Sequence, residues 1–334
     1  MNSPAKEVAA VLDAAPRVVR ARAACLLAGL ALAAALAWPA VSNADCALRL
    51  MELPVAIVGQ RAVATVMING AQVPLLVDTG AFYSTLTPQT AETLHLHVVD
   101  APMTLDVRGV TGRVATRLTR VEHLRLLKGG EIANVDFLVG GVTPAPGTMG
   151  VLGRNLLDLG DTEYDLANGV VRLVRRVGEC SGANLAYWVA KDAPLSEVRL
   201  ERDDSRFAPA VHAVASIDGQ KLRVLLDSGA TSVLSAQTAS RLGVQWDRGT
   251  PAGALQGASG AASPYWMAAV DRFEIGGEEI RHVRLKVADL EMGDDFMLLG
   301  IEFFLSHRIY VSPTSRRMLF TYNGGSVFGT AVPP

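Results

Sequence analysis

The chain has 334 residues, half of them hydrophobic and 19% charged, so it is long enough for two domains or one large two-lobed body with a substantial core. The formal net charge is −2, and this leaves no basic excess for a nucleic-acid-binding face. Composition therefore favours a globular protein with no nucleic-acid partner.

The N-terminus has the pattern of an export signal. Three arginines at positions 17–22 precede an apolar run at residues 25–37, and small residues at 42–44 follow it. The run is shorter than the roughly 20 residues that a transmembrane helix needs. We expect residues 1–44 to be a signal peptide, with an uncleaved membrane anchor as the alternative. Either interpretation predicts an exported protein, periplasmic or extracellular.

The cysteine count agrees with export. The chain contains Cys25, Cys46 and Cys180, and removal of the signal would leave two of them. An even pair in an oxidising compartment favours one disulfide, between Cys46 and Cys180. The alternative is two unpaired thiols without a role.

The most informative feature is an internal duplication. Residues 68–70 (ING) match 217–219 (IDG), and residues 78–81 (DTGA) match 227–230 (DSGA), both 149 positions apart. Three further pairs of segments keep the same order at offsets of 148 or 147: 86–91 with 234–239, 109–112 with 257–260, and 151–153 with 298–300.

Each repeat reads as all-β with few short helices. A run rich in β-formers ends in Asn-Gly at 69–70 or Asp-Gly at 218–219, which are strong hairpin signals. The apolar runs at 75–77 and 224–226 then predict strands buried on both faces, each leading directly into an aspartate. Short helices are expected at residues 87–94 and 235–242, because each begins with a capping Thr or Ser.

The two aspartates, Asp78 and Asp227, are the candidate catalytic residues. A pseudo-twofold axis between the repeats would bring the two strand ends together and place the carboxylates side by side. Two carboxylates in contact cannot both ionise easily, so they share a proton, which suits one as a base and the other as an acid. Active-site loop support is expected from four neighbours: hydrogen bonds across the axis from the Thr79 and Ser228 hydroxyls, and permissive backbone at Gly80 and Gly229.

These repeated Asp-Thr/Ser-Gly-Ala loops resemble those of retropepsin-like aspartic proteases, in a single-chain form with two fused repeats. The resemblance covers about residues 50–325, and it extends to residues 152–155 (LGRN), which match the family's segment behind the catalytic loop. The second copy, residues 299–302 (LGIE), lacks the Arg and Asn, so its supporting network is expected to differ. The resemblance implies flap hairpins that close over substrate, at Gly109, Val110, Thr111 and Gly112 and at Gly257, Ala258, Ser259 and Gly260.

The resulting prediction is an all-β, two-lobed retropepsin/pepsin-like fold. We expect an N-terminal lobe at 45–178, an inter-lobe connection at 179–206 and a C-terminal lobe at 207–334. The predicted function is that of a monomeric aspartic endopeptidase acting on extended polypeptides, with no cofactor and no metal. The alternative is a non-catalytic peptide-binding or scaffold protein that has kept the fold.

Overall fold

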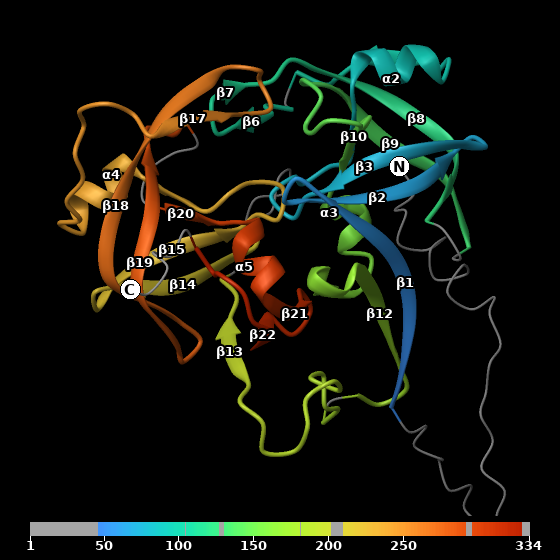
Figure 1. Ribbon diagram of the computed structural model, residues 1–334. Coiled ribbons are helices and arrows are strands. Elements are labelled where there is room, and N and C mark those ends of the chain that lie inside the picture. The colour runs from blue at the N-terminus through green and yellow to red at the C-terminus, as the bar shows by residue number, and fades with distance from the viewer. Residues whose placement is uncertain are drawn as a thin grey trace, which may run out of the picture.

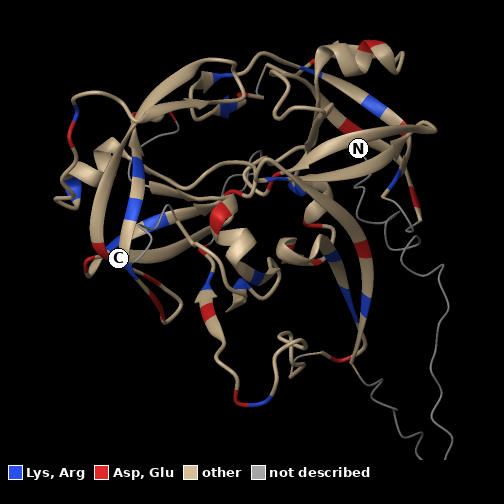
Figure 2. Cartoon of the chain, in the orientation of Figure 1, with Lys and Arg blue, Asp and Glu red and all other residues tan. Residues whose placement is uncertain are grey.

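The computed structural model describes residues 46–103, 105–126, 130–180, 182–201, 210–291 and 296–328. The expected signal peptide or anchor at 1–44 lies outside the described residues. Within the described ranges, no helix has the length and apolar character needed to cross a membrane. Basic and acidic residues are interspersed along the strands rather than collected into one basic field (Figure 2).

The N-terminal lobe is a single sheet with the strand order β1-β2-β3-β10-β4-β9-β8-β5. Most neighbours are antiparallel, but β3 with β10 and β4 with β9 are parallel, so two parallel pairs sit at the centre of the lobe. The strands are β1 (Ala47–Val58), β2 (Arg61–Ile68), β3 (Ala71–Val77), β4 (Thr85–Leu86), β5 (Val98–Asp100), β8 (Thr116–Arg125), β9 (Glu131–Gly140) and β10 (Gly150–Leu152).

The C-terminal lobe repeats this topology. Its order is β14-β15-β20-β16-β19-β18-β17, and β15 with β20 and β16 with β19 are again parallel. Figure 1 shows the two lobes side by side. The strands are β14 (His212–Ile217), β15 (Gln220–Leu226), β16 (Val233–Ser235), β17 (Gly253–Gln256), β18 (Ala262–Ile275), β19 (Glu278–Ala288) and β20 (Phe296–Leu299).

The local signals of the sequence form the expected elements in both copies. Asn69 and Asp218 adopt positive φ angles of 47° and 48°, and a glycine follows each, so both hairpins turn where the sequence predicts. The short helices α2 (Pro88–Thr93) and α4 (Ala236–Arg241) begin after Thr87 and Ser235, whose hydroxyls accept the backbone N–H of Thr90 and Thr238 at 3.1 Å. The other helices are α3 (Arg154–Leu157), the 3-10 turn η1 (Leu166–Asn168) and α5 (Ile301–Ser306).

A sheet built from strands of both halves joins the lobes at their base (Figure 1). Its order is β13-β22-β21-β11-β12-β1, and the two halves meet where β11 pairs antiparallel with β21. Strand β1 belongs to both this sheet and the N-terminal sheet, since it pairs with β12 and with β2. The strands not yet bounded are β11 (Asp161–Asp165), β12 (Val170–Val177), β13 (Ser196–Arg199), β21 (His307–Ser312) and β22 (Arg317–Tyr322).

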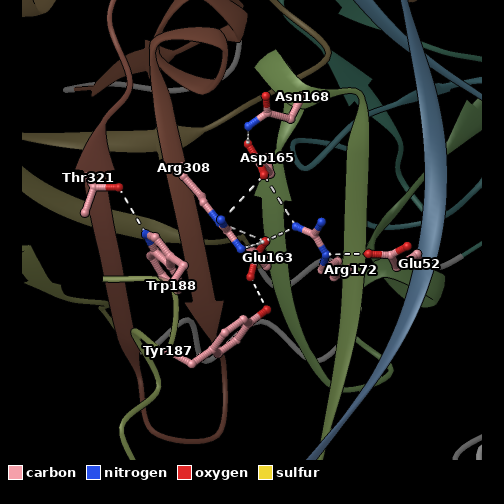
Figure 3. A network of polar contacts seen from close by, with 9 residues as sticks. All are labelled: Glu52, Glu163, Asp165, Asn168, Arg172, Tyr187, Trp188, Arg308 and Thr321. Carbon is pink, nitrogen blue, oxygen red and sulfur yellow. Dashed lines mark hydrogen bonds and ion pairs between the residues drawn. The ribbon is translucent and has the colours of Figure 1, made fainter. Parts of the chain in front are cut away.

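A buried carboxylate ties the two halves of this sheet together. Glu163 on β11 is fully buried and accepts hydrogen bonds from Arg172 on β12, from Arg308 on β21 and from the Tyr187 hydroxyl. Figure 3 shows these groups converging on Glu163 from three parts of the chain. Trp188 packs beside them, with Arg308 over its ring at 5.1 Å from the centroid. A buried charge is tolerated because both guanidinium groups and the phenol satisfy it.

The structure pairs Cys46 with Cys180, with Cα atoms 4.8 Å apart. The bond connects the start of β1 to the chain just beyond β12, two neighbouring strands of the inter-lobe sheet. A disulfide persists in an oxidising compartment, so this pair indicates an exported environment.

Loss of this disulfide is expected to destabilise the folded protein. The bond closes a separation of 134 residues, and a cross-link of this length restricts the unfolded chain strongly. Cys46→Ser combined with Cys180→Ser should lower the free energy of unfolding in urea by about 2–4 kcal/mol. Wild-type protein reduced with a thiol is the control and should match the double variant. Equal stability of oxidised and reduced protein would contradict the prediction.

Candidate active site

The fold places Asp78 and Asp227 at equivalent positions, each one residue beyond a buried strand. The backbone N–H of Asp78 donates to the carbonyl of Leu152 (3.1 Å), and that of Asp227 donates to Leu299 (3.0 Å). Each bond continues the parallel pairing of β3 with β10 or of β15 with β20. The central parallel strands of each lobe therefore fix where its aspartate emerges.

The two carboxyl groups face each other across the lobe interface. Asp78 Oδ1 accepts the backbone N–H groups of Gly80 (2.8 Å) and Ala81 (3.0 Å), and Asp227 Oδ1 accepts that of Gly229 (3.0 Å). A Cβ atom on Gly80 would lie 2.6 Å from Asp227 Cγ, and one on Gly229 would lie 2.3 Å from Asp78 Cγ. Each carboxyl thus packs over the other loop's glycine, where no side chain fits.

Reciprocal hydrogen bonds lock the two loops together. Thr79 Oγ1 donates to the carbonyl of Leu226 (2.8 Å) and accepts the backbone N–H of Ser228 (2.9 Å). In the mirror arrangement, Ser228 Oγ donates to the carbonyl of Val77 (3.0 Å) and accepts the backbone N–H of Thr79 (3.1 Å). Both side chains are buried. Four buried bonds leave the two carboxyl groups little freedom to separate.

The electrostatics of the pair favour one shared proton. Burial raises the pKa of Asp227 well above its usual range, and the neighbouring charge and hydrogen bond of Asp78 raise it further. Burial also raises the pKa of Asp78, although the backbone N–H of Ala81 and the Asp227 side chain oppose the shift. Because the groups interact directly, the protons belong to the pair rather than to either residue.

A second layer of hydrogen bonds supports each loop. In the N-terminal lobe, Asn155 Oδ1 accepts the backbone N–H and the hydroxyl of Ser84 (2.7 and 2.8 Å). In the C-terminal lobe, Glu302 Oε2 accepts the same two groups of Ser232 (2.8 and 3.1 Å). The acceptor is thus kept, because a carboxylate oxygen accepts as an amide oxygen does. The expected difference lies in the rest of the side chain, where Asn155 Nδ2 donates to the Asp136 carbonyl (3.4 Å) and Glu302 Oε1 instead pairs with Lys286 (3.6 Å).

The neighbouring position also differs between the halves. Arg154 is buried and forms an ion pair with Asp158 at 3.3 Å, whereas the equivalent Ile301 is buried in the hydrophobic core. The duplication thus keeps the hydrogen-bond acceptor behind each loop and changes the side chain beside it.

Two hairpin tips meet above the aspartates. One is the turn of β6 (Arg108–Gly109) and β7 (Gly112–Arg113), and the other joins β17 to β18. Thr111 and Ser259 contact each other through their hydroxyls (2.8 Å), and Ser259 Oγ also donates to the Thr111 carbonyl (3.1 Å). Gly112 and Gly260 adopt positive φ angles of 115° and 85°. All eight residues expected in the flaps lie in or beside these tips.

A cleft of about 380 Å³ lies between the hairpin tips and the aspartates. Both carboxyl groups line it, together with Gly109, Val110, Gly257 and Ala258 from the two tips. Three cationic residues also line the cleft: Arg108, which precedes the first hairpin tip, and Arg61 and Lys286, which the sequence analysis did not select. Neither has a charged counterpart in the other repeat, so the duplication gave no signal for them. Among the described residues, no group of three or more His, Cys, Asp and Glu side chains could hold a metal ion.

A two-lobed β fold with duplicated Asp-Thr/Ser-Gly loops meeting at one axis defines the retropepsin-like and pepsin-like class of proteins. The family model described as aspartyl protease matches twice, at residues 64–156 and 213–303, and the chain belongs to this family. The two matches correspond to the two repeats.

Solved structures with similar folds include an aspartic proteinase from Irpex lacteus, at 12% identity and a TM-score of 0.45, covering 82% of this chain and 97% of that chain. Soybean basic 7S globulin is also similar, at 12% identity and a TM-score of 0.41, covering 81% of this chain and 94% of that chain. No curated protein matches the sequence.

Gly80 is expected to tolerate no side chain. In Gly80→Ala, the new Cβ would overlap the Asp227 carboxyl group, which a hydrogen bond from Gly229 holds in place. The free energy of unfolding should fall by about 1–3 kcal/mol, as for other overpacked sites. Gly182→Ala is the control, because a Cβ there meets nothing within 4 Å. Urea unfolding of both variants checks the prediction, and equal effects would refute it.

Asp227→Asn is expected to stabilise the protein at neutral pH. The pKa of Asp227 is raised in the folded state, so folded protein holds a proton that the unfolded chain releases above about pH 4. The free energy of unfolding of the wild type therefore falls as the pH rises toward the raised pKa of Asp227. Asparagine does not ionise, so the variant does not show this fall. The free energy of unfolding, measured from pH 4 to pH 7, should increase for the variant relative to the wild type as the pH rises. A constant difference across this range would contradict the assignment.

Proposed function

We propose that the protein is an aspartic endopeptidase in which Asp78 and Asp227 together activate a water molecule. The observation that carries the proposal is the pair of facing carboxyl groups, held by reciprocal loop bonds at the floor of a covered cleft. The raised pKa values of both groups favour a state with one proton and one negative charge, which is the state this chemistry needs.

The reaction follows from that protonation state. The ionised carboxylate takes a proton from the water, and the protonated carboxyl donates its proton to the carbonyl oxygen of the peptide bond. The water oxygen then bonds to the carbonyl carbon and gives a tetrahedral intermediate with no covalent link to the protein. Transfer of a proton to the amide nitrogen breaks the C–N bond and releases the two peptides.

The cleft suits an extended polypeptide substrate. The hairpin tips line the cleft at Gly109 and Gly257, and a strand-like peptide can bind beside such hairpins through its own backbone. The tips contact each other through Thr111 and Ser259, so they must part for the peptide to enter. Because one chain supplies both halves of the cleft, a monomer suffices. The proposed reaction uses only the two aspartates and a water molecule, so it needs no cofactor. We place the protein in the periplasm or outside the cell, with residues 1–44 as its signal peptide or anchor.

Single substitutions of either aspartate test the proposal. Asp78→Asn and Asp227→Asn should each lower peptide cleavage by roughly 10²–10⁴-fold, because each removes one of the two proton-transfer groups. The measurement is cleavage of a diverse peptide library, with protein beginning at Asp45, at pH 3 to 7.

Asp218→Asn provides the matched control. The first repeat already carries an asparagine, Asn69, at this turn, and both side chains accept a backbone N–H from the neighbouring strand (2.8 and 3.0 Å). This variant should cleave like the wild type. Cleavage that survives both active-site substitutions would refute the assignment. Folded protein that binds peptides without cutting them would instead support a non-catalytic binding protein.

A further inference from the structure

The two lobes line the cleft with equivalent strands but different charges. In the N-terminal lobe, Thr85 on β4 pairs with Leu138 on β9 and with Val151 on β10. All three line the cleft, and none is charged. At these strand positions the N-terminal half of the cleft therefore has no charge, and Arg108 of its hairpin tip, which also lines the cleft, is paired with Asp106 at 2.8 Å.

The equivalent positions of the C-terminal lobe contain a cation. Val233 on β16 pairs with Lys286 on β19 and with Leu298 on β20, in the same register. These three residues also line the cleft, so Lys286 takes the place that Leu138 holds in the other half. The Lys286 side chain is 24% exposed, and its Nζ lies over the Tyr265 ring at 5.6 Å from the centroid.

The ammonium of Lys286 retains capacity for a ligand. Its charged neighbour is Glu302, whose Oε1 lies 3.6 Å from Nζ, while Oε2 of the same group is engaged by Ser232. Lys286 lines the cleft, and it also lines a neighbouring cavity together with Glu302, which is not among the cleft residues. An ammonium has three donors, so a single carboxylate at 3.6 Å leaves donors for a ligand in the cleft.

A second cation lies against the same half. Arg61 lines the cleft and donates to the carbonyl of Gly229, on the C-terminal catalytic loop (2.5 Å). The residue 149 positions later in the repeat is Ala210, so this charge too is one-sided. Among the described residues that line the cleft, the aspartate pair is the acidic component.

We propose that the C-terminal half of the cleft selects an acidic residue of the substrate beside the scissile bond, while the N-terminal half takes an apolar residue. This inference rests on the proposed function, because it names the substrate class for the same cleft. A glutamate or aspartate side chain reaching Lys286 would form a charge-assisted hydrogen bond, and the equivalent contact at Leu138 offers only apolar surface.

The test compares short fluorescent peptides that are identical except for Glu or Gln at one position, scanned along an otherwise apolar, extended sequence. Binding is measured by anisotropy with Asp227→Asn protein at about pH 6, where a peptide glutamate is ionised. At one position the Glu peptide should bind about five-fold more tightly than its Gln partner, the effect expected of a partly exposed charge pair. Introducing Lys286→Leu, which installs the residue of the first repeat, should abolish the difference.

Arg284→Leu is the matched control. Arg284 lies two residues earlier on β19 and is exposed, and it does not line the cleft. This variant should keep the Glu preference. Equal binding of the Glu and Gln peptides at every position would overturn the proposal. A Lys286→Leu variant that binds both peptides more weakly by the same factor would also overturn it, because that result indicates a structural role for Lys286. Failure of the catalytic proposal is a separate outcome, in which wild-type protein prefers Glu peptides but cleaves none.

Discussion

Two carboxyl groups in direct contact, Asp227 buried and Asp78 half-buried, are the constraint on which this structure depends. Each raises the free energy of ionising the other, and burial adds to that cost, so a pair of this kind persists only where surrounding groups oppose its separation. The Thr79 and Ser228 bonds supply that opposition at the loops, because each hydroxyl satisfies two backbone groups of the opposite lobe. Any movement of one lobe relative to the other would leave buried donors without acceptors, which is costly.

The inter-lobe sheet also holds the two lobes in a fixed relative position, far from the aspartates. In this sheet the two halves of the chain carry complementary rather than identical side chains. Glu163 on β11 lies directly opposite its repeat equivalent, Tyr310 on β21. Asp161 on β11 accepts the Tyr310 hydroxyl (2.7 Å), and Arg308 on β21 donates to Glu163 (3.0 Å). A duplicated surface with identical charges would repel itself across the axis. The two strands have instead diverged, so that β11 carries acidic side chains and β21 carries an arginine and a tyrosine. Their side chains therefore attract each other across the axis.

The sequence predicted those parts of the site that the duplication repeats. The two aspartates, the glycines that follow them and the hydroxyl residues between recur at a single offset in the sequence. The apolar runs before the aspartates predict the buried strands. The local pattern and the internal repeat together therefore locate the aspartate pair. The acceptor role of Glu302 was not predicted, because its residue type differs from that of Asn155, although its position in the repeat matches. Arg61, Lys286 and Tyr187 gave no signal. Their roles depend on strand register and on a non-repeating segment, neither of which periodicity reveals.

The same distinction explains where specificity can arise in a duplicated cleft. In the proposed reaction the two aspartates need the same support from both sides, so the residues around them must stay equivalent. A peptide has direction, however, and it presents different side chains to the two lobes. Cleft-lining positions outside the two aspartate loops, such as Leu138 and Lys286, can therefore diverge. Charge on one side of the axis orients a peptide in a way that a symmetric cleft cannot, since a symmetric cleft binds either direction with equal free energy.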